Sequence, residues 1–230
     1  MFSKIQHITM AILYEIHPQN PQERILEKIK DDLKDGAVML YPTDTVYAIG
    51  CDLTVKSAIE RVRRIKQLSN DKPLTFLCSS LSNITDYAIV SDSAYRLIKR
   101  LVPGTYTFLL PATKLVPKLV MSPKRKTTGI RVPNHQGCLS ILKTLGNPII
   151  STSAHITTEE EGQAPIALPI EHQVDKARLY DSLSKLVDII VDDTSDPGYH
   201  VSTIIDLTTD QPVIIRKGQG WQEVEEWFEE

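Results

Sequence analysis

The sequence has few cysteines and lacks the short motifs that bind common cofactors. Its three cysteines, Cys51, Cys78 and Cys138, form no C-x-x-C pair, which excludes a zinc knuckle and a disulfide framework and favours a reducing compartment, the cytoplasm. The six histidines show no metal-ligand spacing, so no protein-bound metal is expected. The patterns G-x-x-x-x-G-K-[ST], G-x-G-x-x-G, H-E-x-x-H and G-x-S-x-G are all absent, which excludes the usual nucleotide-binding loops.

Long apolar runs are also missing. No stretch reaches about 18 uninterrupted apolar residues, so a membrane span is excluded. The apolar run near the start is broken by Gln6, His7 and Glu15 and has no cleavage site after it, so no signal peptide is expected. With 230 residues and 41% hydrophobic residues, the chain is expected to form one α/β domain with a core over about residues 15–218 and an acidic tail over 219–230.

The charges are segregated along the chain, although the net charge is only −3. Residues 93–158 contain ten Lys and Arg and no Asp or Glu, whereas residues 159–230 contain 17 acidic and five basic residues. Such an arrangement draws an anionic ligand to one place on a protein. A solvated lysine surface is the alternative interpretation of the basic block.

The order of periodic segments predicts an α/β fold, a mixed, twisted, open sheet with helices packed on it and a concave cationic cleft. Helices are expected from a cap at Asn20 to Gly36, from a cap at Thr54 to Lys66, and over 93–102, 137–145 and 179–186. Strands are expected over 37–41, 46–51, 74–78, 106–110, 129–132, 148–151, 187–191, 203–207 and 212–216. In such sheets ligands bind at crevices off strand ends, which directs attention to loops 43–45 and 151–155.

Seven local sequences, in this order and spacing, carry a resemblance to a known family. They are YPTDTVYAIGCD (41–52), KQLSNDKP (66–73), PGTYTFLL (103–110), KRKTTGIRVP (124–133), STSAH (151–155), STIID (202–206) and IIRKG (214–218). Together they resemble the threonylcarbamoyl-adenylate synthase superfamily (YrdC/TsaC-like) over roughly residues 15–218. The HPQNPQ opening, the YA of YAIGC and the KRKT before GIRVP resemble the YciO branch most.

The resemblance implies a nucleotidyltransferase that combines L-threonine, bicarbonate and ATP into threonylcarbamoyl-adenylate and pyrophosphate for tRNA modification. Magnesium would enter with the phosphates of ATP, and no tightly bound organic cofactor is implied. Such chemistry needs reactant positioning and charge neutralisation rather than a covalent nucleophile. By match to the family pattern, the threonine and carbamate pocket would contain Thr43, Thr45 and Ser202, and the nucleotide would be held by Lys66, Lys72, Arg131, Ser151, Ser153, His155 and Arg216.

Each assignment has a structural alternative. Thr43 could stabilise a turn, Lys66 could complement a helix dipole, and Arg131 could form a structural ion pair. Ser151 and Ser153 could cap the next turn. The basic residues Lys124, Arg125 and Lys126 could clamp phosphates or form a surface for RNA, so a protein that binds double-stranded RNA or tRNA without catalysis is a second interpretation.

Three departures from the synthase pattern stand out. Leu68 replaces an arginine, His155 replaces an asparagine, and Ala48 replaces a glycine of the first motif. A longer acidic insertion, residues 157–165, follows His155, and its three consecutive glutamates with Gly162 and Pro165 predict a mobile flap. The loss of a forked cation near an enclosed anion costs on the order of 2–4 kcal/mol, so these departures predict a weaker synthase or another acceptor.

Overall fold

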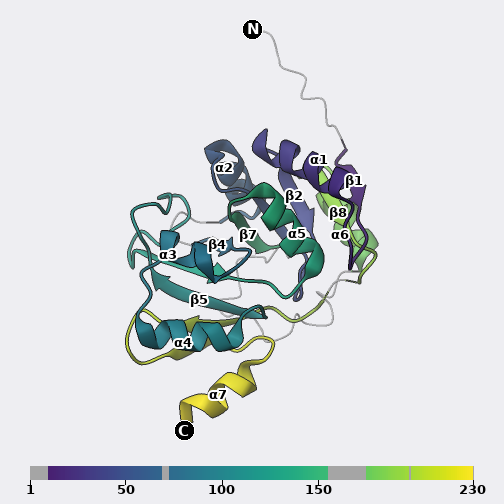
Figure 1. Cartoon of the computed structure of the whole chain (residues 1–230). Coiled ribbons are helices and arrows are strands. Elements are labelled where there is room, and N and C mark those ends of the chain that lie inside the picture. Colours follow the sequence, from purple (N-terminus) through teal and green to yellow (C-terminus); the bar gives the residue numbers. More distant parts are fainter. Residues whose placement is uncertain (1–9, 69–72, 155–174, 197, 230) are drawn as a thin grey trace.

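The computed structural model describes residues 10–68, 73–154, 175–196 and 198–229. Its helices and strands alternate as the periodicity predicts (Figure 1). The strands are β1 (Ile12–Glu15), β2 (Val38–Tyr41), β3 (Ala48–Asp52), β4 (Thr75–Leu77), β5 (Tyr106–Pro111), β6 (Thr127–Arg131), β7 (Ile149–Ser153), β8 (Ile189–Asp192), β9 (Thr203–Asp206) and β10 (Val213–Arg216). The helices are α1 (Glu23–Lys34), α2 (Lys56–Ile65), the 3-10 turn η1 (Leu81–Asn83), α3 (Ile84–Tyr87), α4 (Asp92–Leu101), α5 (Gln136–Leu145), α6 (Lys176–Leu183) and α7 (Trp221–Glu229).

All ten of these strands form one mixed sheet, in the order β1-β8-β2-β3-β7-β4-β6-β5-β9-β10. The pairs β1/β8, β2/β8, β4/β6 and β5/β9 are parallel, and the other neighbours are antiparallel. The mixed open sheet predicted from the alternation of periods is therefore confirmed.

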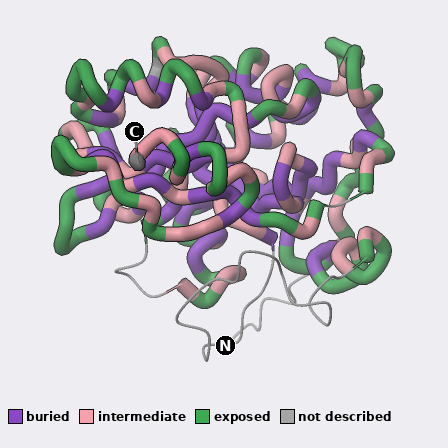
Figure 2. Tube along the Cα trace, turned by 90° about the horizontal axis from the view of Figure 1, so that it is seen from below, coloured by how far each residue is buried: buried purple, intermediate pink, exposed green. Residues whose placement is uncertain are grey.

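The two faces of the sheet are covered differently. One face carries Ile49, Phe76 and Ile130, which pack in a continuous apolar core with residues of α2, α4, α6 and α7. On the other face, Met39 and Ile149 pack with residues of α1 and α5, but this second core stops at β4. Buried segments run through the middle of the molecule (Figure 2). Beyond α5, the second face therefore has no helix over β6, β5 and β9 among the residues described, and this is where a ligand can reach the sheet.

Two predicted helix caps are wrong. Helix α1 begins after Gln22, not Asn20, and α2 begins after Val55, not Thr54, and neither cap position makes a side-chain cap bond. The hydroxyl of Thr54 instead donates to the Asp52 carboxylate at 2.8 Å, an Asx-type turn that competes with capping. Helices α4, α5 and α6 begin one to three residues before the predicted positions, with caps at Ser91, His135 and Asp175.

The predicted ends of the core also need correction. Strand β1 begins at Ile12, ahead of the predicted start near residue 15, and it pairs with β8 from the far end of the chain. The predicted tail, 219–230, contains helix α7, whose Val224 is fully buried in the core. None of the helices in the described parts of the chain is long and apolar enough to cross a bilayer.

Candidate functional site

A cavity of about 220 Å³ lies on the face of the sheet that α5 leaves open. Its lining, as far as the chain is described, contains two arginines, eight Ser and Thr residues, and no carboxylate: Thr43, Thr45, Val46, Ala48, Pro73, Leu74, Thr75, Leu77, Thr107, Leu109, Gly129, Arg131, Ser151, Thr152, Ser153, Val201, Ser202, Ile204 and Arg216. Guanidinium and hydroxyl groups are donors whose chemistry suits an anion.

The pleat explains how distant motifs meet here. Ser151 pairs with both Thr75 and Gly50, and Thr75 pairs with Gly129 on the next strand. Because directly opposite residues of neighbouring strands point to the same face, these positions form a continuous row across the sheet. A Cβ on Gly50 would lie 2.8 Å from the carbonyl oxygen of Ile150, so glycine permits this close approach of strands.

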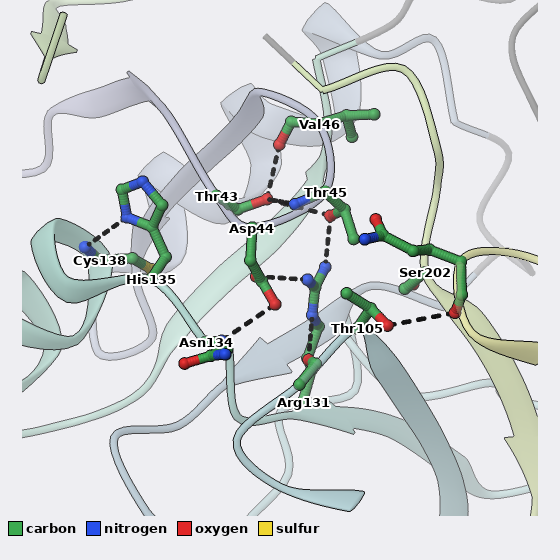
Figure 3. Close-up of polar contacts among 12 residues, drawn as sticks. Thr43, Asp44, Thr45, Val46, Thr105, Arg131, Asn134, His135, Cys138 and Ser202 are labelled. Atoms are coloured by element: carbon green, nitrogen blue, oxygen red, sulfur yellow. Dashed lines mark hydrogen bonds and ion pairs between the residues drawn. The ribbon is translucent and has the colours of Figure 1, made fainter. Parts of the chain in front are cut away.

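Arg131 ends β6 and is held on three sides (Figure 3). Its Nη2 donates to Asp44 Oδ1 at 2.5 Å, its Nη1 to Thr45 Oγ1 at 2.8 Å, and its Nε to the Gly104 carbonyl at 3.3 Å. Only 7% of the Arg131 side chain and 10% of the Asp44 side chain are exposed. The other carboxylate oxygen of Asp44 accepts from Asn134 N at 3.0 Å. Arg131 therefore forms the structural ion pair considered from the sequence, with its charge neutralised by Asp44.

Residues 43–45, the threonine loop, extend the hydrogen-bond network of Arg131. The hydroxyl of Thr43 donates to the Val46 carbonyl at 2.6 Å, so it must accept, rather than donate, in its 3.0 Å bond with Thr45 Oγ1. Thr45 Oγ1 thus donates to Thr43 and accepts from Arg131. One lone pair of Thr45 remains, which suits a ligand group that donates, such as an amine or a hydroxyl.

Arg216 differs from Arg131 in having no carboxylate partner among the described residues. Its Nε donates to the Ser202 carbonyl and its Nη2 to Ser202 Oγ, both at 2.9 Å, and its other N–H groups have no partner in the part of the chain that the structure describes. Burial, with a smaller contribution from the nearby charge of Arg131, lowers the pKa of Arg216 to about 10. Arg216 is thus a half-buried cation without a counter-charge among the described residues, which is the electrostatic arrangement that favours an anion.

Ser151 and Ser153 both line the cavity, at the end of β7. Tyr41 Oη donates to Ser151 Oγ at 2.7 Å, which leaves the Ser151 proton for another acceptor. The sequence did not identify Thr75, Thr107, Gly129 or Thr152 as site residues. The strand register, which places Thr75 opposite Ser151 and Gly129, brings Thr75 and Gly129 into the same row.

The predicted lysines stand apart from this cavity. Lys66 is the C-terminal cap of α2, and its ammonium group has no hydrogen-bond or ion-pair partner among the described residues; burial lowers the pKa of this group to about 8. It is not among the cavity-lining residues. Leu68 packs partly buried against the larger core. Lys72, His155 and the predicted flap over 157–165 lie outside the described residues.

The basic cluster of Lys124, Arg125 and Lys126 is exposed in the turn before β6 and is not in contact with the cavity. Strand β6 separates it from Arg131 by its full length, roughly 13 Å at the usual rise per residue. We therefore expect no contact between these residues and a phosphate inside the cavity, and their roles as a phosphate clamp or an RNA surface both stay predictions. Among the described residues, no group of His, Cys, Asp and Glu side chains is placed to hold a metal ion.

His135 connects the loop before α5 to the loop after β8. Its Nδ1 accepts from Cys138 N at 3.2 Å, and its Nε2 lies 3.0 Å from Asp193 Oδ2. Although burial raises the pKa of Asp193, hydrogen bonds from His135 and Ser195 outweigh it and lower that pKa to about 2. Gly198 lies directly against the threonine loop: a Cβ on Gly198 would overlap the Thr45 carbonyl oxygen at 1.6 Å.

Comparison with known proteins gives a consistent result. A family model, Sua5_yciO_yrdC, described as "Telomere recombination", matches residues 31–218. Protein YciO of Escherichia coli is 38% identical over 92% of this chain and 97% of its own length, and its crystal structure superposes with a TM-score of 0.80. The threonylcarbamoyl-AMP synthase of Vibrio vulnificus is 28% identical over 84% of this chain and 98% of its own length. The crystal structure of P. abyssi Sua5 complexed with L-threonine covers 94% of this chain and 60% of that protein, at 25% identity and a TM-score of 0.78.

Proposed function

Because this chain belongs to the Sua5/YciO/YrdC family, we propose that it is an enzyme of the threonylcarbamoyl-adenylate synthase type. The reaction consumes L-threonine, bicarbonate and ATP. The threonine nitrogen is carboxylated to a carbamate, the carbamate oxygen forms a bond to the α-phosphorus of ATP, and the bond from that phosphorus to pyrophosphate breaks. Threonylcarbamoyl-adenylate, pyrophosphate and water are the products.

The observation that carries this proposal is the cavity, whose lining contains eight Ser and Thr residues and in which Arg216 has no counter-charge from any residue that the structure describes. The chemistry brings together three anions, namely a carboxylate, a carbamate and a phosphate chain. Fixed donors that are already oriented stabilise such charges without reorganisation during the reaction. Arg216 and the Ser151 hydroxyl supply donors on one side, and the free lone pair of Thr45 Oγ1 receives the threonine amine on the other.

Magnesium belongs to this proposal as a partner of ATP. It would neutralise the phosphate charge and leave with pyrophosphate, and the chain's own residues would orient the reactants. Holding two reactants in a productive arrangement removes much of the entropic barrier to their reaction. Leu68, where the synthases carry an arginine, leaves this protein with one cation fewer, so we expect a slower reaction than that of the synthases.

The test is to incubate the purified protein with ATP, magnesium, bicarbonate and each amino acid in turn, and to detect the adenylate by mass spectrometry. We expect an adenylate and pyrophosphate that depend on L-threonine. Formation of an adenylate with another amino acid only would give the site a different acceptor. Binding of RNA with a steep salt dependence, and no adenylate with any amino acid, would favour the RNA-binding interpretation instead.

A further inference from the structure

The segment that follows β10 is attached to the cavity wall, although the family model ends at residue 218. Gln219 N donates to the Val201 carbonyl at 2.8 Å. Two hydroxyls, from Thr105 and Thr203, donate to the Gln219 carbonyl at 3.1 and 2.9 Å. The residues between β10 and α7 are therefore connected to both strands, β5 and β9, that form this side of the cavity.

Two glycines allow this close approach. A Cβ on Gly218 would lie 2.4 Å from the Val201 carbonyl oxygen, and a Cβ on Gly220 would lie 2.5 Å from Tyr106 Oη. Gly220 also has a φ of +76°, a left-handed conformation that side chains disfavour. The backbone here fits against the strands with no room for a side chain.

Helix α7 anchors the far end of the segment. Tyr106 Oη lies 3.2 Å from the Gly220 carbonyl oxygen and 3.1 Å from Glu223 Oε2, so its one proton is shared between these two acceptors. Lys217 Nζ lies 2.5 Å from Glu225 Oε1 and 3.9 Å from the centre of the Trp221 ring. Val224, one turn into the helix, is fully buried. Helix α7 is thus held by Tyr106 of β5 and by Lys217, the residue that follows β10.

Arg216 directly precedes this attached segment. Arg216 is the last residue of β10, the edge strand of the sheet, and a register shift interrupts its pairing with β9 between Ile214 and Arg216. Beyond this shift Arg216 pairs with Ile204, which fixes its backbone. Its guanidinium has no carboxylate partner and is held only by Ser202 among the described residues.

We propose that residues 217–220 and α7 form a C-terminal clasp that positions the Arg216 guanidinium over Ser202 in the cavity. Tyr106, Gly220 and Glu223 are positioning residues in this arrangement: they act on the ligand only through Arg216. The consequence for ligand binding rests on the proposed function, whereas the positioning itself does not.

The first test needs no ligand. We would measure the solvent exchange of the Arg216 Nε–H by nuclear magnetic resonance in the wild type, in Gly220→Ala and in Gly146→Ala. Gly146 has nearly the same φ, +80°, but nothing lies within 4 Å of an added Cβ, so it matches the backbone strain without touching the clasp. We expect exchange at Arg216 to accelerate by about tenfold in Gly220→Ala only, with Arg131 Nε–H unchanged in all three proteins.

Tyr106→Phe is the second variant, in case Gly220→Ala does not fold. It removes the hydroxyl whose proton is shared between Gly220 and Glu223 and keeps the ring, and it should accelerate exchange at Arg216 by a smaller factor. Unchanged Arg216 exchange in a folded Gly220→Ala or Tyr106→Phe protein would overturn the clasp. Calorimetry of the wild type with magnesium-ATP then separates the two proposals. Faster Arg216 exchange in the variants, together with a wild type that binds no ATP, would refute the proposed function and leave the clasp standing.

Discussion

Two arginines line the same cavity and occupy opposite electrostatic situations. Arg131 ends β6, a strand inside the sheet, and is neutralised by Asp44, whereas Arg216 ends an edge strand and has only neutral partners among the residues described. Both sequences around them, GIRVP and IIRKG, look equally suited to anion binding. The difference teaches that two arginines of one cavity can have different tasks: Arg131, whose donors are already satisfied, maintains the shape of the site, and we expect Arg216 to provide the affinity for an anion.

The largest expected effect is the loss of stability when Arg131 is replaced. Arg131→Ala leaves the Asp44 carboxylate buried without a counter-charge, and we expect it to lower the free energy of unfolding by about 3–5 kcal/mol. Denaturant unfolding measures the loss. The double variant Arg131→Met with Asp44→Leu should lose less than the sum of the two single variants, because it leaves no unpaired charge. A loss below about 1 kcal/mol in Arg131→Ala would show that the pair is not structural.

Replacement of Arg216 should have the opposite result, a loss of ligand affinity with little change in stability. Arg216→Ala is expected to weaken the binding of magnesium-ATP by about 1.5–3 kcal/mol, roughly 10- to 100-fold, while unfolding changes by less than about 1 kcal/mol. Calorimetry gives the affinity. Arg178→Ala, an exposed arginine on α6 with 81% of its side chain accessible, is the matched control for the change in net charge. Equal losses in both variants would assign the effect to general charge rather than to the cavity.

Lys66 is the second cation whose charged group has no partner among the described residues, and a pH series tests its effect on stability. Its pKa is lowered by burial to about 8 from an ordinary 10.5, so between these values the unfolded chain binds more protons than the folded one. The stability contributed by this group should therefore rise with pH through that window, by at most about 1.4 kcal/mol per pH unit. Lys66→Met should flatten the slope relative to the wild type. An identical slope in both proteins would mean that Lys66 is solvated.

The smallest effect is expected at the exposed basic cluster. Replacing Lys124, Arg125 and Lys126 together by alanine should change the affinity for magnesium-ATP by less than about 0.5 kcal/mol, because these residues are not in contact with the cavity. The same variant should reduce the salt dependence of any RNA binding. A large loss of ATP affinity would place the cluster at the nucleotide after all.

Most helices and strands could be predicted from the sequence, because the periodicity of segments such as 106–110 and 129–132 is that of strands. The register between the strands could not. The pairing of β1 with β8, 177 residues apart at Ile12 and Ile189, has no local signal and was missed. Thr75 and Thr107 entered the site only through the register. The neutralisation of Arg131 by Asp44 also depends on a contact across 87 residues that residue types cannot indicate.

Detection of the product with labelled bicarbonate tests the account most directly. The wild type, Arg216→Ala and Arg178→Ala would each be incubated with ATP, magnesium, L-threonine and ¹³C-bicarbonate, and threonylcarbamoyl-adenylate would be measured by mass spectrometry. We predict a labelled product that depends on threonine in the wild type and Arg178→Ala, with at least about tenfold less in Arg216→Ala. Equal product from Arg216→Ala, or no labelled product from the wild type, would contradict the assignment of this cavity as the site of adenylate formation.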